Sequence, residues 1–146
     1  MGKIYIHCGS NVFKPELVEK NYTRWDKPSG LWASPEDTDC GWRDWCECEE
    51  FHVERLKSSF KFTLKKIAKV LQVYSLADIK PFLSDNPDSL FFDKKLNLDM
   101  IYSKFDAMEV HMSANWCELH DSHLFYTWDV DSIVIWNPDV VEVINS

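Results

Sequence analysis

The stretch Asp106-Ala107-Met108-Glu109-Val110-His111-Met112 is the most informative part of the sequence about the fold. Its centre is apolar apart from one carboxylate, as expected of a strand inside a sheet. Glu109 lies between Met108 and Val110, where a carboxylate must either face solvent or be held for a purpose, because burying an unpaired charge is costly. We therefore predict a strand over 106–112 and take Glu109 as the first candidate for a functional residue.

Further strands and helices are predicted on both sides of this stretch. Alternating or short apolar runs predict strands over 3–8, 31–34, 59–64, 67–74, 131–136 and 140–144. Helices are predicted over 35–54, 75–82, 90–104 and 113–125, and a loop over 84–89. Because strands and helices do not alternate regularly, we expect an α+β fold with twisted, mostly antiparallel sheets and flanking helices.

Length and composition predict one domain spanning residues 1–146. The chain has 146 residues, of which 45% are hydrophobic and 14% aromatic, enough to form a core. Its formal net charge of −8 disfavours nucleic acid as a partner, because nucleic-acid binding relies on basic side chains that neutralise phosphates. The N-terminus does not resemble a signal peptide, and no run approaches the ~20 apolar residues of a membrane span. We therefore expect a cytoplasmic protein that does not bind membranes.

The cysteine and glycine patterns disfavour several common kinds of site. The five cysteines are an odd number at irregular spacing, which predicts reduced thiols. Cys40, Cys46, Cys48 and His52 could be drawn together as a zinc site, but their spacing is not that of a standard zinc knuckle. We expect no metal. Neither a G-x-G-x-x-G motif nor a P-loop is present, so a dehydrogenase-type dinucleotide fold is not supported.

Two other segments complete a candidate site with Ala107-Met108-Glu109-Val110. They are Tyr5-Ile6-His7-Cys8-Gly9-Ser10, at the end of the first strand, and Gly30-Leu31-Trp32-Ala33-Ser34, after a strong turn signal. In order and setting the three segments resemble the ADP-ribosyltransferase superfamily, particularly the branch with a His-Tyr-Glu signature that includes diphtheria toxin. The chain also resembles small uncharacterised bacterial and phage proteins with a Lys-Pro-x-Gly-Leu-Trp-Ala-Ser segment.

The resemblance implies an ADP-ribosyltransferase or NAD glycohydrolase that uses NAD as its substrate. It implies that His7 binds the adenosine ribose, with Gly9 beside it in the same motif. Trp32 would stack on the nicotinamide ring, Trp42 would be the second aromatic residue, and Ser34 would brace the cleft. The acceptor of the ADP-ribose is unknown and is expected to be a protein.

The resemblance also implies that Glu109 is the catalytic residue. Cleavage of the nicotinamide–ribose bond passes through an oxocarbenium-like state, which a carboxylate hydrogen-bonded to the adjacent 2′-hydroxyl stabilises. Members of the superfamily that modify arginine carry Glu or Gln two residues before this glutamate. Ala107 occupies that position here, so an arginine acceptor is not expected.

Structural explanations compete with each of these roles. His7 could be a satisfied structural histidine, and Trp32 could simply pack in the core. Glu118 is a rival to Glu109 if the strand is misplaced. The alternative function is a non-catalytic interaction module, in which the acidic, tryptophan-rich segment 42–51 forms the binding face. A relative that removes phosphate from RNA ends would require basic residues, which the net charge disfavours.

Overall fold

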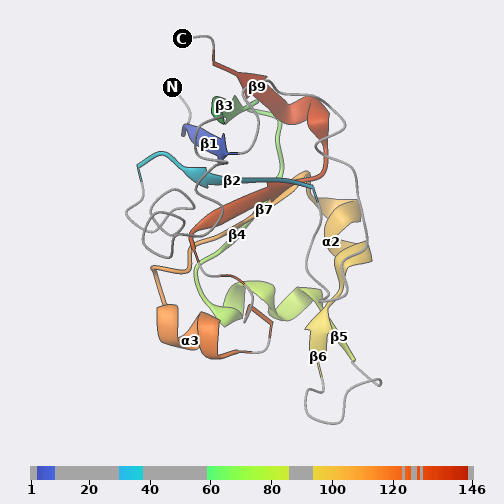
Figure 1. The fold of residues 1–146 in the computed structure, drawn as a ribbon. Coiled ribbons are helices and arrows are strands. Elements are labelled where there is room, and N and C mark those ends of the chain that lie inside the picture. Colours follow the sequence, from blue (N-terminus) through green and yellow to red (C-terminus); the bar gives the residue numbers. More distant parts are fainter. Residues whose placement is uncertain are drawn as a thin grey trace.

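The computed structural model describes residues 3–8, 30–37, 59–85, 94–122, 124–125, 128 and 130–144. Within these ranges seven strands form one sheet in the order β4-β7-β8-β2-β1-β3-β9 (Figure 1). They are β1 (Tyr5–Cys8), β2 (Leu31–Pro35), β3 (Ser59–Leu64), β4 (Val70–Val73), β7 (Ala107–Val110), β8 (Ser132–Ile135) and β9 (Val141–Val143). Only β4 and β7 pair in parallel, so the predicted mostly antiparallel sheet is confirmed.

The helices are short and lie between the strands in the sequence. They are η3 (Leu76–Phe82), α2 (Leu98–Lys104), α3 (Trp116–Asp121) and η4 (Pro138–Val140), and a separate two-stranded sheet is made by β5 (Leu83–Asp85) and β6 (Lys94–Leu96). In Figure 1, β1, β3 and β9 lie above β2, whereas η3 and α3 lie below the sheet. None of the helices in the described ranges is long and apolar enough to cross a membrane.

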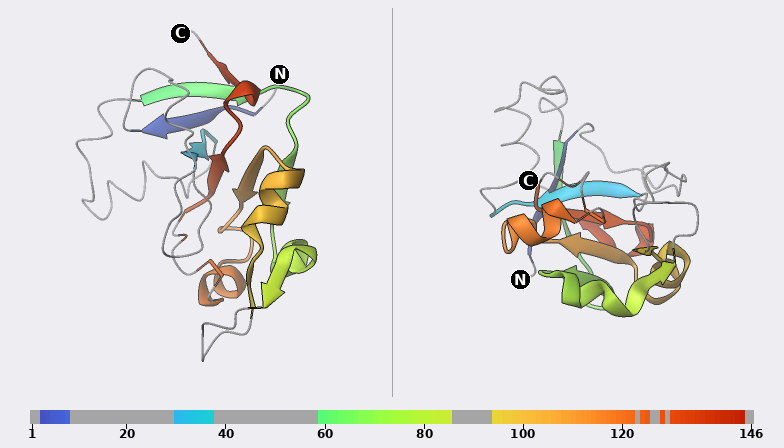
Figure 2. Two further views of the ribbon diagram at one scale, coloured as in Figure 1. Left: turned by 90° about the vertical axis from the view of Figure 1, so that its right-hand side faces the viewer. Right: turned by 90° about the horizontal axis from the view of Figure 1, so that it is seen from below.

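The sheet has two faces that pack against different partners. The helical face carries Val73, Val110 and Val134, which share one buried cluster with residues of η3, α2 and α3. The aromatic face carries Ala107 and Ile133, which share the other cluster with Tyr5, Phe60 and Phe62. Figure 2 shows that β1 and β3 lie across the direction of β4 and β7, because twist accumulates along a long sheet. The β1 end therefore folds toward the aromatic face.

Most predicted strands are confirmed, with their ends shifted by a few residues. Strand β3 has the predicted bounds, and β2 extends one residue further, to Pro35. The strand predicted over 67–74 is shorter, because residues 66–67 form a turn and β4 begins at Val70. The predicted strands 106–112 and 131–136 are present as β7 and β8.

The helix predicted over 90–104 is wrong for residues 94–96, whereas 90–93 lie outside the described residues. Lys94–Leu96 form β6, and Asp85 pairs with Lys94 across the two strands, with its carboxylate 2.6 Å from Lys94 Nζ. This cross-strand ion pair and the alternation of Lys95 with Leu96 favour a strand locally. The helix instead begins at Leu98, where Asn97 Oδ1 accepts a hydrogen bond from Met100 N at 3.1 Å.

Three other predictions change in extent. The loop predicted over 84–89 is wrong for residues 84–85, which belong to β5. The helix predicted over 113–125 contracts to α3, and the helix over 75–82 is a 3-10 helix capped by Ser75, with Pro81 inside it. Of the helix predicted over 35–54, residues 36–37 form a turn, and 38–54 lie outside the described residues.

Candidate functional site

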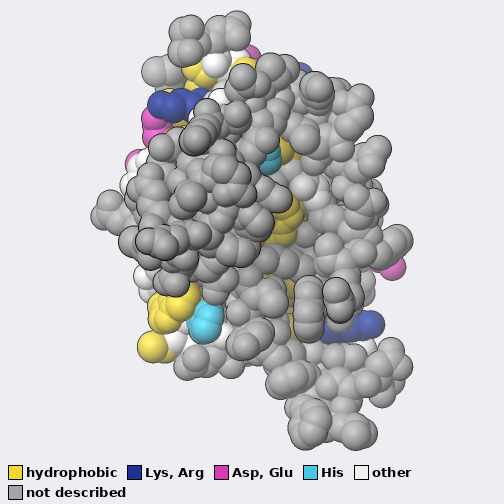
Figure 3. Space-filling view, viewed as in Figure 1, with side chains coloured by type: hydrophobic (Ala, Val, Ile, Leu, Met, Phe, Trp, Pro, Cys, Tyr) yellow, Lys and Arg dark blue, Asp and Glu magenta, His cyan; other side chains and the backbone are white. Residues whose placement is uncertain are grey.

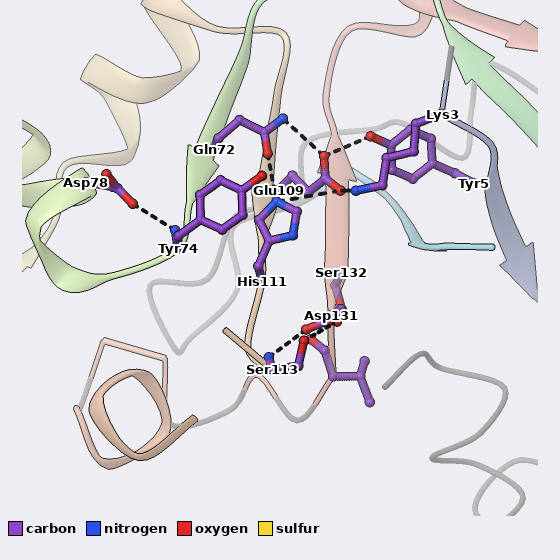
Figure 4. A network of polar contacts seen from close by, with 11 residues as sticks. Lys3, Tyr5, Gln72, Tyr74, Asp78, Glu109, His111, Ser113, Asp131 and Ser132 are labelled. Atoms are coloured by element: carbon purple, nitrogen blue, oxygen red, sulfur yellow. Dashed lines mark hydrogen bonds and ion pairs between the residues drawn. The ribbon is translucent and has the colours of Figure 1, made fainter. Parts of the chain in front are cut away.

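The Glu109 carboxylate is the centre of a buried polar cluster on the aromatic face. Its side chain is only 1% exposed, yet each of its oxygens has a hydrogen-bond donor. Oε2 accepts from Lys3 Nζ at 2.8 Å, whereas Oε1 accepts from Tyr5 Oη at 2.8 Å and from Gln72 Nε2 at 3.1 Å (Figure 4). Burial of this charge is therefore compensated by a cation and two neutral donors.

The donors come from strands that are far apart in the sequence. Gln72 lies directly beside Glu109 in the parallel pairing of β4 with β7. Tyr5 reaches Glu109 from β1, and its ring stacks on Phe62 with 5.5 Å between ring centroids. Lys3 lies two residues before Tyr5, and side chains two apart in an extended chain point the same way. The folded sheet thus assembles a site that no single segment contains.

Glu109 retains capacity for one more donor. A carboxylate offers about four acceptor positions, two on each oxygen. Tyr5 and Gln72 occupy both positions on Oε1, and Lys3 occupies one on Oε2. His111 Nε2 is 3.8 Å from Oε2, beyond hydrogen-bond distance. Among the residues that the structure describes, the second acceptor position on Oε2 therefore has no hydrogen-bond donor.

A flat aromatic surface adjoins the carboxylate. His111 directly follows β7, and its backbone N–H donates to Val73 O at 2.9 Å. Its ring stacks on that of Tyr74, with 4.1 Å between centroids and 1° between planes. Tyr74 is 49% exposed, and Figure 4 shows its ring beside His111 and Glu109.

Burial shifts the pKa values of Tyr5 and His111, two neighbours of Glu109, toward their neutral forms. Burial, and then the adjacent Glu109 carboxylate, raises the pKa of Tyr5 well above its usual value. Burial lowers the pKa of His111, although the Glu109 carboxylate opposes this change. Near neutral pH, Tyr5 is therefore a neutral donor and His111 a neutral imidazole.

His7 lies on the same face of the sheet as Glu109. Ile6 pairs with Ser34, so the next residue, His7, lies opposite Ala33. Ala33 pairs with Ile133, and Ile133 pairs with Glu109, so the four side chains follow one another across the strands. The His7 ring is 5.2 Å from that of Phe60, and its Nδ1 lies 2.6 Å from the backbone oxygen of Trp32.

Trp32 lies on the opposite face of the sheet from Glu109. It pairs with Val134, packs against the helical-face cluster, and its ring is 4.7 Å from that of Trp128. Alternation places Ser34, which is buried, on that same face. The structure therefore does not bring Trp32 and Ser34 beside Glu109, because Ala33 is the residue of β2 that faces the Glu109 side.

The remaining candidates are either undescribed or exposed. Gly9, Trp42 and the acidic segment 42–51 lie outside the described residues, as do the four residues of the zinc alternative. Glu118, the rival to Glu109, is exposed on α3. In the described ranges, no group of three or more His, Cys, Asp or Glu side chains is arranged to bind a metal ion.

Sequence reasoning missed most of the polar cluster. Lys3, Tyr5, Gln72, Tyr74 and His111 were not predicted as site residues. Two local signals were available, because Gln72 interrupts an apolar strand as Glu109 does, and His111 lies two residues after Glu109 in an extended segment. No local signal connects Lys3 or Tyr5 with Glu109.

Comparisons with known proteins identify no relative. No protein-family model, no curated protein and no solved structure matches the chain. The function must therefore be argued from the chemistry of the site itself.

Proposed function

We propose that the chain is an NAD-dependent ADP-ribosyltransferase in which Glu109 is the catalytic carboxylate. The observation that carries the proposal is the acceptor position on Glu109 Oε2 that has no donor among the described residues, in a carboxylate that is buried and ion-paired with Lys3. A structural ion pair needs no such position, whereas a carboxylate that binds a substrate hydroxyl does. The resemblance described above gives the reaction class.

In the proposed reaction the 2′-hydroxyl of the nicotinamide ribose donates a hydrogen bond to Glu109 Oε2. The bond between the ribose carbon C1′ and the nicotinamide nitrogen breaks, and its electron pair leaves with nicotinamide. The positive charge then resides on the ribose, where the nearby carboxylate stabilises it. Tyr5 and Gln72 fix the orientation of the carboxylate through Oε1, so little reorganisation is needed as the charge develops.

Tyr74 replaces Trp32 as the proposed stacking residue for the nicotinamide ring. Trp32 faces the other side of the sheet, whereas Tyr74 is half exposed and lies beside Glu109 and His111. A flat ring bound on Tyr74 would gain aromatic stacking and orient the reactive bond. The role of His7 at the adenosine ribose stays part of the proposal, since His7 shares the Glu109 face. The acceptor is proposed to be a protein side chain other than arginine.

The test is titration of the purified protein with NAD, combined with mass spectrometry of nicotinamide release. We expect wild type to bind NAD and release nicotinamide, and Glu109→Gln to bind NAD but lose release by about 100-fold or more, as expected when a preorganised charge is removed. Glu118→Gln makes the same chemical change at an exposed glutamate and is expected to match wild type. Absence of both binding and release in wild type would refute the proposal and favour the interaction module.

A further inference from the structure

The position of Gln72 between Glu109 and His111 defines which nitrogen of His111 carries its hydrogen. A carboxylate can only accept, so the amide group of Gln72 donates to Glu109 Oε1, at 3.1 Å. The amide oxygen of Gln72 consequently faces His111 Nε2, at 2.7 Å. Since that oxygen also can only accept, Nε2 carries the hydrogen. In a neutral imidazole the lone pair then resides on Nδ1.

This lone pair is available for chemistry. Among the residues that the structure describes, none donates a hydrogen bond to His111 Nδ1, and the His111 side chain is 12% exposed. The other polar groups of the cluster cannot act as bases in the same way. Lys3 is the cation of the ion pair with Glu109, and the Tyr5 hydroxyl donates its hydrogen to the same carboxylate.

We infer that His111 is the general base that removes the proton from the acceptor of the ADP-ribosyl group. This inference rests on the proposed function. An acceptor hydroxyl, or water in its absence, forms a bond from its oxygen to C1′ as nicotinamide departs with the electron pair of the broken bond. The hydroxyl proton moves to His111 Nδ1, so the positive charge of the nicotinamide ring ends on the imidazolium, which later releases a proton to solvent.

The charges that face His111 are compatible with this role. Glu109 and Lys3 face it across the cluster, Asp131 faces it from the segment before β8, and Tyr74 stacks on its ring. Burial lowers the pKa of His111, although the carboxylates of Glu109 and Asp131 favour the protonated form and oppose this change. The imidazole is therefore unprotonated at neutral pH. Its Nε2 is 3.8 Å from Glu109 Oε2, which places the ring close to the proposed ribose position.

The first test is independent of activity. Nitrogen NMR of protein labelled with ¹⁵N-histidine reports which ring nitrogen carries the hydrogen. For neutral His111 we expect the hydrogen on Nε2 in wild type and a mixture of both forms in Gln72→Met, which removes the amide oxygen. A hydrogen on Nδ1 of neutral His111 in wild type would overturn the inference.

The second test measures nicotinamide release as a function of pH. We expect His111→Gln to bind NAD, to release nicotinamide about 100-fold more slowly, and to lose the fall in rate that wild type shows at acidic pH. His120→Gln, a histidine outside the cluster that stacks on Trp116, is the matched control and is expected to behave as wild type. If wild type is active and His111→Gln matches it at every pH, the general base is refuted while the transferase stands. If wild type releases no nicotinamide, the proposed function fails, and the role of His111 with it.

Discussion

Gln72 donates to the Glu109 carboxylate with one end of its amide and accepts from His111 with the other, at 3.1 and 2.7 Å. The parallel pairing of β4 with β7 places Gln72 and Glu109 side by side. Gln72→Leu removes both hydrogen bonds and leaves Oε1 of a buried carboxylate with one donor. We expect it to lower the free energy of unfolding by about 1–3 kcal/mol, measured by urea unfolding. Lys69→Leu, an exposed neighbour in sequence, should change it little, and equal losses in both variants would contradict the bridging role.

Tyr5 makes stability sensitive to alkaline pH. Burial and Glu109 raise its pKa in the folded protein above the ordinary value of 10.0. The stabilisation that the protonated Tyr5 hydroxyl contributes is therefore complete below pH 10. It is lost as the pH rises beyond 10, because the tyrosine of the unfolded chain releases its proton first. Tyr5→Phe should cost about 1.5–3 kcal/mol at neutral pH and should flatten the alkaline decrease. Unfolding midpoints measured across the alkaline range check this, and an unchanged slope in Tyr5→Phe would count against it.

His111 acts at the acidic end of the range. Because its pKa is lowered from 6.5 in the folded protein, the unfolded chain binds a proton more readily than the folded chain. The stabilisation that neutral His111 contributes is present above pH 6.5 and is lost as the pH falls through the lowered pKa of the folded protein. We expect His111→Gln to weaken the acidic loss of stability measured by thermal unfolding. Parallel pH profiles for the variant and wild type would show that His111 is not responsible.

Gly30 is required for the approach of β2 to β8. Its φ of +152° is one that L side chains rarely adopt, and a Cβ at this position would lie 2.2 Å from the backbone oxygen of Ile135. Gly30→Ala should therefore lower the free energy of unfolding by at least about 2 kcal/mol. Chemical unfolding measures this loss. Stability equal to wild type would mean that the β2–β8 pairing differs from the one described.

The individual strands could be predicted from the sequence, but the assembly of the site could not. Glu109 was identifiable because a carboxylate in an apolar strand requires partners. Its partners Lys3 and Tyr5 depend on the curvature of the whole sheet, since β8 and β2 lie between β7 and β1 in the strand order and more than a hundred residues separate them in sequence. Local patterns carry no information about such pairings.

The face on which Trp32 lies illustrates the same limit. Side chains alternate along a strand, so a shift of one residue in the pairing of β2 with β8 would exchange the faces of Trp32 and Ala33. The resemblance concerns the order of the motifs along the chain and says nothing about the register between β2 and β8. Residues 94–96, predicted as helix, form a strand for a related reason, because they pair with β5 and local propensity cannot anticipate that partner.

The most direct measurement is a crystal structure of the Glu109→Gln variant with NAD. We expect NAD to bind on the aromatic face, with a hydroxyl of the nicotinamide ribose within hydrogen-bond distance of the side chain at position 109 and the nicotinamide ring against Tyr74. The variant should preserve intact NAD because the catalytic charge is absent. NAD bound against Trp32 on the helical face, or a complex in which the ribose lies away from position 109, would refute the catalytic role of Glu109.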